Sequence, residues 1–269
     1  MKKRAPIPVA NHDNFVAQWL HASANAASAT FTCTALTEAD PQQRGSIQGA
    51  LAEAIFIHHN DPETYRKKLE HLGYPATAAA IDRRPHAPKT RMGNFGEVLA
   101  SEFLRQVRGH RIPVYRLRYN SNDESSPKGD DVLAFEFAER GRPGKDTVIV
   151  AEVKVRSTHT ITAVEEAHDA LRKGHRPRPK SFMFVVDILF REGKDKEAYR
   201  LLDLSHKFGR RSLVRKSVLF LITGNQPRDP FAGVKGRLAP GLEAIHLQLD
   251  QLGDLVQTVF EAQINVDTL

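Results

Sequence analysis

The stretch Val148-Ile149-Val150-Ala151-Glu152-Val153-Lys154-Val155 places two charged residues within an apolar, mostly β-branched run. This composition predicts a buried strand over Thr147–Val155. Because side chains alternate across a strand, Glu152 and Lys154 point to the same face as Val150. A carboxylate and an ammonium group on an apolar strand need either a partner or a functional site. The alternative interpretation is a strand end that reaches solvent, where both charges are hydrated.

The E-x-K pattern also occurs as Glu192-Gly193-Lys194, so the pattern by itself is weak evidence of a site. This second copy contains a glycine and follows an apolar segment, which is typical of a solvated turn. The strand context therefore favours Glu152 and Lys154.

An acidic pair, Asp130-Asp131, stands where a second apolar strand begins, predicted over Asp131–Phe137. Since the two strands follow each other along the chain, the pair can meet Glu152 across neighbouring strands. Carboxylates that converge repel each other unless a cation lies between them. Oxygen ligands suit Mg²⁺ or Mn²⁺, which predicts a metal site formed by this acidic pair and Glu152. The alternative is that both aspartates are turn residues after Gly129.

Hydrophobic periodicity predicts an α/β fold with a mixed central β-sheet flanked by helices. We expect a mostly helical N-terminal region over residues 1–90 and the sheet-containing core over residues 91–269. The N-terminal helices are expected at Ile47–His58, Pro62–Leu72 and Ala76–Ile81, followed by a linker at Arg83–Lys89. The expected core helices are Asn94–Val107, Ala163–Lys173, Lys196–Lys207 and Gln251–Ala262, and the further strands are Ile112–Tyr119, Phe182–Leu189, Val218–Ile222 and Ile245–Leu249.

Glu97 is expected in the first turn of the helix Asn94–Val107. If that helix starts against the sheet, the glutamate points to the same place as Glu152. The alternative is an ordinary first-turn glutamate that complements the helix dipole.

Basic residues gather in a proline-broken loop after the expected helix Ala163–Lys173. Such a loop can follow a phosphate backbone, although a solvated basic loop is the alternative. The predicted nucleic-acid-binding residues are Arg172, Lys173, Arg176, Arg178 and Lys180.

The composition is that of a globular protein with a basic excess. The net charge of the 269 residues is +7, which favours polyanionic partners such as DNA. One cysteine, Cys33, excludes an intrachain disulfide and a cysteine-rich zinc site and fits a reducing compartment. No run of 18 apolar residues occurs, so we expect no membrane partner and a cytoplasmic location.

Three segments in this order resemble the PD-(D/E)xK nuclease superfamily and, within it, the HamA family, the nuclease subunits of Hachiman antiphage defence systems. They are Gly96-Glu97-Val98-Leu99-Ala100, Lys128-Gly129-Asp130-Asp131 and Ala151-Glu152-Val153-Lys154. The similarity spans about residues 90–265. The superfamily's usual proline before the catalytic aspartate is absent, so Asp130 and Asp131 both remain candidates. Asp131 is favoured because it adjoins the apolar strand.

The resemblance implies a restriction-endonuclease-like core and a metal-dependent DNA nuclease that acts in antiphage defence with a helicase subunit, HamB. It implies that Asp131, Glu152 and the Val153 carbonyl hold Mg²⁺ or Mn²⁺, with Glu97 assisting directly or through water. It also implies that Lys154 positions a water molecule or stabilises developing charge. Two other functions remain open: a restriction or repair nuclease without such a partner, and a catalytically inactive nucleic-acid-binding module.

Overall fold

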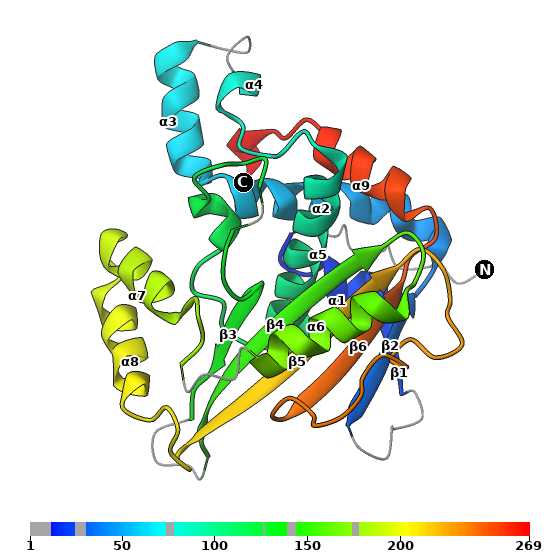
Figure 1. Ribbon diagram of the computed structural model, residues 1–269. Helices are drawn as coiled ribbons and strands as arrows, with labels where there is room; N and C mark the ends of the chain where they lie inside the picture. Colours follow the sequence, from blue (N-terminus) through cyan, green and yellow to red (C-terminus); the bar gives the residue numbers. More distant parts are fainter. Residues whose placement is uncertain (1–11, 25–30, 74–77, 126, 139–143, 174–177) are drawn as a thin grey trace, which may run out of the picture.

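A six-stranded mixed sheet in the order β1-β2-β6-β5-β4-β3 forms the centre of the fold (Figure 1). The computed structural model describes residues 12–24, 31–73, 78–125, 127–138, 144–173 and 178–269. The strands are β1 (Leu20–Ala24), β2 (Thr32–Glu38), β3 (Val132–Glu136), β4 (Asp146–Arg156), β5 (Leu213–Thr223) and β6 (Leu242–Gln248).

The four central strands, β2, β6, β5 and β4, run parallel to one another, and β1 and β3 add antiparallel edges. Strands covered on both faces need near-continuous apolar runs, which β4 and β5 supply from Val148 and Val218 onward. This arrangement confirms the expected mixed sheet flanked by helices.

Helices cover the two faces of the sheet and enclose two apolar cores. One face packs on α5 (Pro88–Glu102), α2 (Arg44–His59) and α9 (Leu252–Glu261). The other packs on α6 (Ile161–Lys173), and the hairpin α7 (Phe182–Arg191) and α8 (Asp195–Ser205) lies beyond β3 (Figure 1). The remaining helices are α1 (Phe15–Trp19), α3 (Pro62–Leu72) and α4 (Ala78–Ile81), with short turns η1 (Pro41–Gln43), η2 (Phe103–Val107), η3 (Arg116–Tyr119) and η4 (Val266–Thr268).

Helix α5 approaches β4 closely because residue 96 is a glycine. A Cβ atom there would lie 2.3 Å from Val155 Cγ2 and 2.9 Å from Val153 Cγ1. The valines at 153 and 155 therefore face α5, and the alternation places Glu152 and Lys154 on the opposite face of the sheet. The packing of this helix fixes the orientation of the charged end of β4.

Two predicted strands are wrong. Phe182–Leu189 is the helix α7, whose buried side chains at 182, 185, 186 and 189 follow the helical spacing. Ile112–Tyr119 forms no strand: Arg111, just before it, makes a single bridge to Phe135, and Arg116–Tyr119 is the 3₁₀ turn η3. Pro113 lacks the N–H group that a strand ladder requires.

The N-terminal region, expected to be mostly helical, also contributes the strands β1 and β2, which join the sheet through β6. The division of the chain near residue 90 stays a prediction. The helix expected from Asn94 begins at Pro88 instead, so Glu97 lies in its interior rather than in its first turn. Within the described residues, no helix is long and apolar enough to cross a membrane.

Candidate active site

Glu152 and Lys154 lie where β4 runs past the end of β3. The last paired residues are Val132 and Ala151, so the edge of β4 is open from Glu152 onward. Lys154 Nζ lies 2.8 Å from Glu152 Oε1, and both side chains are largely but not fully buried. Val150, which shares their face, packs in the core on the α6 and α7 side.

Asp131 precedes β3 and is tied to the same part of β4. Its Oδ2 atom accepts a hydrogen bond from the Val153 N–H group at 2.8 Å. Burial raises the pKa of Asp131, although this hydrogen bond and the positive charge of Lys154 oppose the shift. Burial also raises the pKa of Glu152, and the negative charge of Asp131 adds to it. The two carboxylates are therefore close enough to repel each other.

Glu97 adds a third carboxylate from the interior of α5. It is buried, and this burial, with repulsion from Asp131, raises its pKa to about 8 in spite of the nearby Arg116. Glu97 and Asp131 thus lie near enough for their charges to interact.

A cleft with a volume of about 830 Å³ opens beside these groups. Glu97, Asp131, Val153 and Lys154 line it, together with residues at the start of α5 and Glu124. Glu152 does not line the cleft itself, but it is hydrogen-bonded to Lys154, which does. A polymer strand or another extended ligand can thus reach Lys154 and Asp131 from solvent.

Arg116 is a site residue that sequence reasoning missed. Its buried guanidinium donates from Nη1 to the Asp131 carbonyl at 3.0 Å and from Nη2 to the carbonyls of Pro127 and Lys128, each at 3.3 Å. It holds the segment that carries Asp131. Arg116 was not predicted because it falls in an alternating segment that resembles a strand.

Asp130 has different partners from Asp131. Its N–H group donates to Ser181 Oγ at 2.9 Å, and its Oδ2 atom accepts from the Ser181 N–H group at 2.8 Å. Both residues are buried. Asp131 is therefore the aspartate that approaches Glu152, and Asp130 is bound to the start of α7. Ser181 carried no recognisable motif in the sequence.

The donor chemistry fits a hard cation, but only in part. Asp131 and Glu152 supply oxygen atoms, and the Val153 carbonyl lies on the same strand edge as its N–H group. Among the residues that the structure describes, no group of three or more histidine, cysteine, aspartate or glutamate side chains is arranged to hold a metal ion. Such an ion would need ligands from the main chain, water or substrate.

The predicted basic residues separate into two groups. Arg172 and Lys173, at the end of α6, both form ion pairs with Asp169. Arg178 and Lys180 are exposed and precede α7. Arg176 lies outside the described residues. The second E-x-K copy is an exposed turn after α7, where Lys194 pairs with Glu192, as expected.

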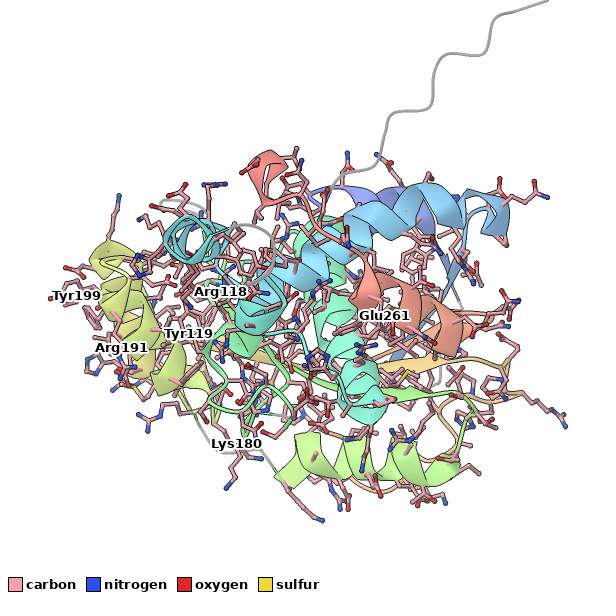
Figure 2. All side chains as sticks on the ribbon, turned by 90° about the horizontal axis from the view of Figure 1, so that it is seen from above. Arg118, Tyr119, Lys180, Arg191, Tyr199 and Glu261 are labelled. Carbon is pink, nitrogen blue, oxygen red and sulfur yellow. The ribbon has the colours of Figure 1, made fainter. Side chains whose placement is uncertain are left out.

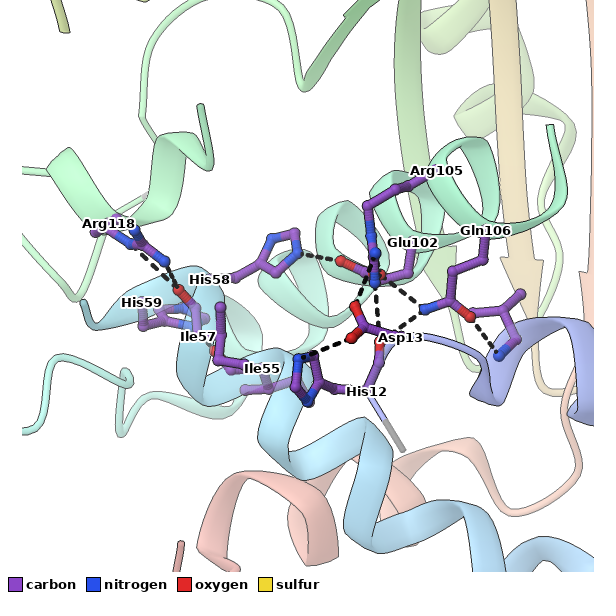
Figure 3. Close-up of polar contacts among 11 residues, drawn as sticks. His12, Asp13, Ile55, Ile57, His58, His59, Glu102, Arg105, Gln106 and Arg118 are labelled. Atoms are coloured by element: carbon purple, nitrogen blue, oxygen red, sulfur yellow. Dashed lines mark hydrogen bonds and ion pairs between the residues drawn. The ribbon is translucent and has the colours of Figure 1, made fainter. Parts of the chain in front are cut away.

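A buried polar network lies behind α5 (Figure 3). Glu102 Oε1 lies 2.8 Å from His58 Nε2, and Glu102 Oε2 accepts hydrogen bonds from Arg105 and Gln106. The side-chain oxygen of Gln106 also accepts a hydrogen bond from the Val16 N–H group. The network joins α5, α2 and α1 and uses His58 in a structural role.

Sequence comparisons agree with this architecture. The model of the HamA family matches residues 13–262. The Hachiman protein HamA of Bacillus cereus is 34% identical over 198 residues, which cover 71% of this chain and 70% of the relative. The family-model match includes both β1 and β2 and the charged end of β4. On this evidence, the chain belongs to the HamA family.

Proposed function

We propose that this protein is a metal-dependent DNA nuclease of the PD-(D/E)xK type that acts in Hachiman antiphage defence. The observation that carries the proposal is the convergence of Asp131, Glu152 and Lys154 at the open edge of β4, beside a solvent-accessible cleft. Family membership supports the place in antiphage defence.

In this proposal Asp131 and Glu152 hold Mg²⁺ or Mn²⁺, with the Val153 carbonyl as a further ligand and Glu97 assisting. The bound ion supplies Lewis-acid polarisation of the scissile phosphate and lowers the pKa of a coordinated water. The hydrogen bond from Val153 keeps one Asp131 oxygen oriented, which leaves the other free to act as a ligand. Lys154 lies on the cleft wall, where its ammonium group can stabilise negative charge on the phosphate.

The nuclease is proposed to work with the helicase subunit of the same defence system, which would deliver unwound DNA to the cleft. The open cleft of about 830 Å³ fits an extended strand better than it fits a small, enclosed ligand.

The test is cleavage of plasmid and single-stranded DNA by the purified protein, with and without the helicase subunit. We expect activity with Mg²⁺ or Mn²⁺, loss of activity in EDTA, and loss in Glu152→Gln. Cleavage that persists in EDTA would contradict the metal mechanism. Wild-type activity in Glu152→Gln would show that the active site lies elsewhere. DNA binding without cleavage under all of these conditions would favour a catalytically inactive nucleic-acid-binding module.

A further inference from the structure

The start of α7 is fastened to the turn before β3 by the Asp130–Ser181 pair. Each of the two residues donates its N–H group to the side chain of the other, at 2.9 and 2.8 Å. Gly129 makes room for this contact: its φ angle is +130°, and a Cβ atom there would lie 2.4 Å from Ser181 Oγ. Both side chains of the pair are buried, so its geometry is well determined by its surroundings.

The pair places Lys180 on the same side of the sheet as Glu152 and Lys154. Lys180 precedes Ser181 directly, and Phe182, the next residue, packs in the same core as Val150. Val150 shares its face of β4 with Glu152 and Lys154, so the segment that carries Lys180 packs from the side of the sheet on which these two residues lie. Its charge acts on Glu152, whose pKa it lowers against the effect of burial.

Lys180 is also available to a ligand. It is exposed, and no carboxylate lies within ion-pair distance of it in the described part of the chain, whereas Arg172 and Lys173 are both occupied by Asp169. Figure 2 shows its side chain at the surface, between α6 and the α7–α8 hairpin. Lys154, in contrast, is engaged by Glu152.

We propose that Lys180 binds a phosphodiester group next to the scissile one, and that Asp130 and Ser181 are positioning residues that hold it there. This inference rests on the proposed nuclease function and deepens it. In the proposed function Lys154 and the metal ion serve the scissile phosphate, so a neighbouring phosphate beside the three carboxylates of the site needs a further cation. A lysine acts there as a point charge, and a rigid attachment lowers the cost of ordering it.

A merely structural pair makes a different prediction. If Asp130 and Ser181 only dock the α7–α8 hairpin, their loss lowers stability without changing the number of phosphate contacts. The salt dependence of DNA affinity distinguishes the two roles, because each lost phosphate contact lowers its slope by about 0.7 to 0.9.

The experiment measures the dissociation constant of a labelled single-stranded oligonucleotide in EDTA at several salt concentrations, with the full chain and with the helicase subunit present if binding requires it. Lys180→Ala should lower the slope by about one contact, and Lys180→Arg should restore it. Ser181→Ala changes no charge, yet it should lower the slope similarly. The double variant should be no weaker than Lys180→Ala. Lys67→Ala, an exposed lysine of α3, is the matched control and should leave the slope unchanged.

Turnover gives a second readout, because a binding contact outside the reacting atoms should appear in KM. Lys180→Ala and Ser181→Ala should each raise KM several-fold while kcat stays within about twofold. If Ser181→Ala is poorly folded, Ser181→Thr tests the pair instead, because it keeps a hydroxyl group. The proposal is supported if the salt dependence of DNA affinity is that of the wild type in Ser181→Thr and is reduced in Asp130→Asn.

An unchanged slope in Lys180→Ala overturns the inference, as does a slope that falls in Lys180→Ala but not in Ser181→Ala or Asp130→Asn. Wild-type protein that does not bind the oligonucleotide overturns it as well. Since binding is measured without metal, failure here is distinguishable from failure of the nuclease proposal. If only the Lys180 inference fails, the wild type still cleaves DNA. If only the nuclease proposal fails, Lys180 still contributes to the salt dependence of binding, but no cleavage occurs.

Discussion

Asp131 and Val153 are joined by a hydrogen bond, 2.8 Å long, from the Val153 main-chain N–H group to the Asp131 side chain, just before the first residue of β3. The aspartate directly precedes the paired part of β3. This bond fixes its carboxylate against the Glu152–Val153 peptide, a contact that Asp130 does not make.

Asp131→Asn and Asp130→Asn should have separable effects. We expect Asp131→Asn to reduce kcat by about a hundredfold or more, as when a principal electrostatic group of an active site is removed. Asp130→Asn should chiefly weaken substrate binding, because its carboxylate is bound to Ser181. Steady-state cleavage kinetics measure both. A more severe loss of kcat in Asp130→Asn would reverse the assignment of the metal ligand.

The two E-x-K segments provide a matched comparison of a lysine at the site with a lysine in a loop. Each lysine pairs with its glutamate, at 2.8 Å for Lys154 and 2.7 Å for Lys194. Lys154→Ala should abolish cleavage while folding and most DNA affinity persist, since only Lys154 lines the cleft. Lys194→Ala should behave as wild type in the same assay. Activity that depends on Lys194 but not on Lys154 would mean that the wrong segment was chosen.

Gly96 and Gly93 allow a test of the close contact between α5 and β4. Gly96→Ala should lower the free energy of unfolding by about 1–3 kcal/mol, because its methyl group would overlap Val153 and Val155. Gly93→Ala, in the same helix but with no atom within 4 Å of its added Cβ, should raise it by about 0.5–1 kcal/mol. Urea denaturation measures both values. Equal effects of the two substitutions would show that α5 does not press on β4.

The buried network at Glu102 predicts part of the acid sensitivity of the protein. Burial alone would raise the pKa of Glu102, but the hydrogen bond with His58 and the charge of Arg105 lower it from 4.5 to about 2. A lowered folded-state pKa stabilises the protein above pH 4.5, and this stabilisation is lost as the pH falls toward 2. It amounts to roughly 3 kcal/mol at most.

Glu102→Gln should therefore be less stable than wild type at pH 7, and its unfolding free energy should fall less steeply between pH 4.5 and 2. Glu70→Gln, on the exposed part of α3, is the control and should follow the wild-type curve. The measurement is urea denaturation at several pH values. Parallel curves for Glu102→Gln and wild type would exclude this contribution.

The sequence predicted β4 well because this strand combines β-branched residues, burial and alternation in a single segment. It predicted α7 wrongly because the apolar run of Phe182–Leu189 fits a buried strand by composition, and only its spacing reveals a helix. The strands β1 and β2 were missed because their sequences carry weak patterns, and β2 joins the sheet only through β6, which is distant in sequence.

The candidate site shows the same limit. Glu97, Asp131, Glu152 and Lys154 were proposed from residue type and spacing, and the structure brings them together. Arg116 and Ser181 act through main-chain groups and a tertiary contact, and neither leaves a periodic signal in the sequence. The start of α5 at Pro88 was missed because two prolines in the linker obscured the helix boundary.

The pairing of β2 with β6 also has a consequence for how the chain matures. Thr32 lies beside Glu243, so roughly two hundred residues must be synthesised between the two partners. Until β6 emerges from the ribosome, β2 has only β1 beside it, and an isolated two-stranded hairpin is marginally stable in water. Contacts this distant in sequence form slowly. The newly made protein should thus acquire its full sheet only at the end of translation, and chaperones that shield exposed strand edges should bind it before then.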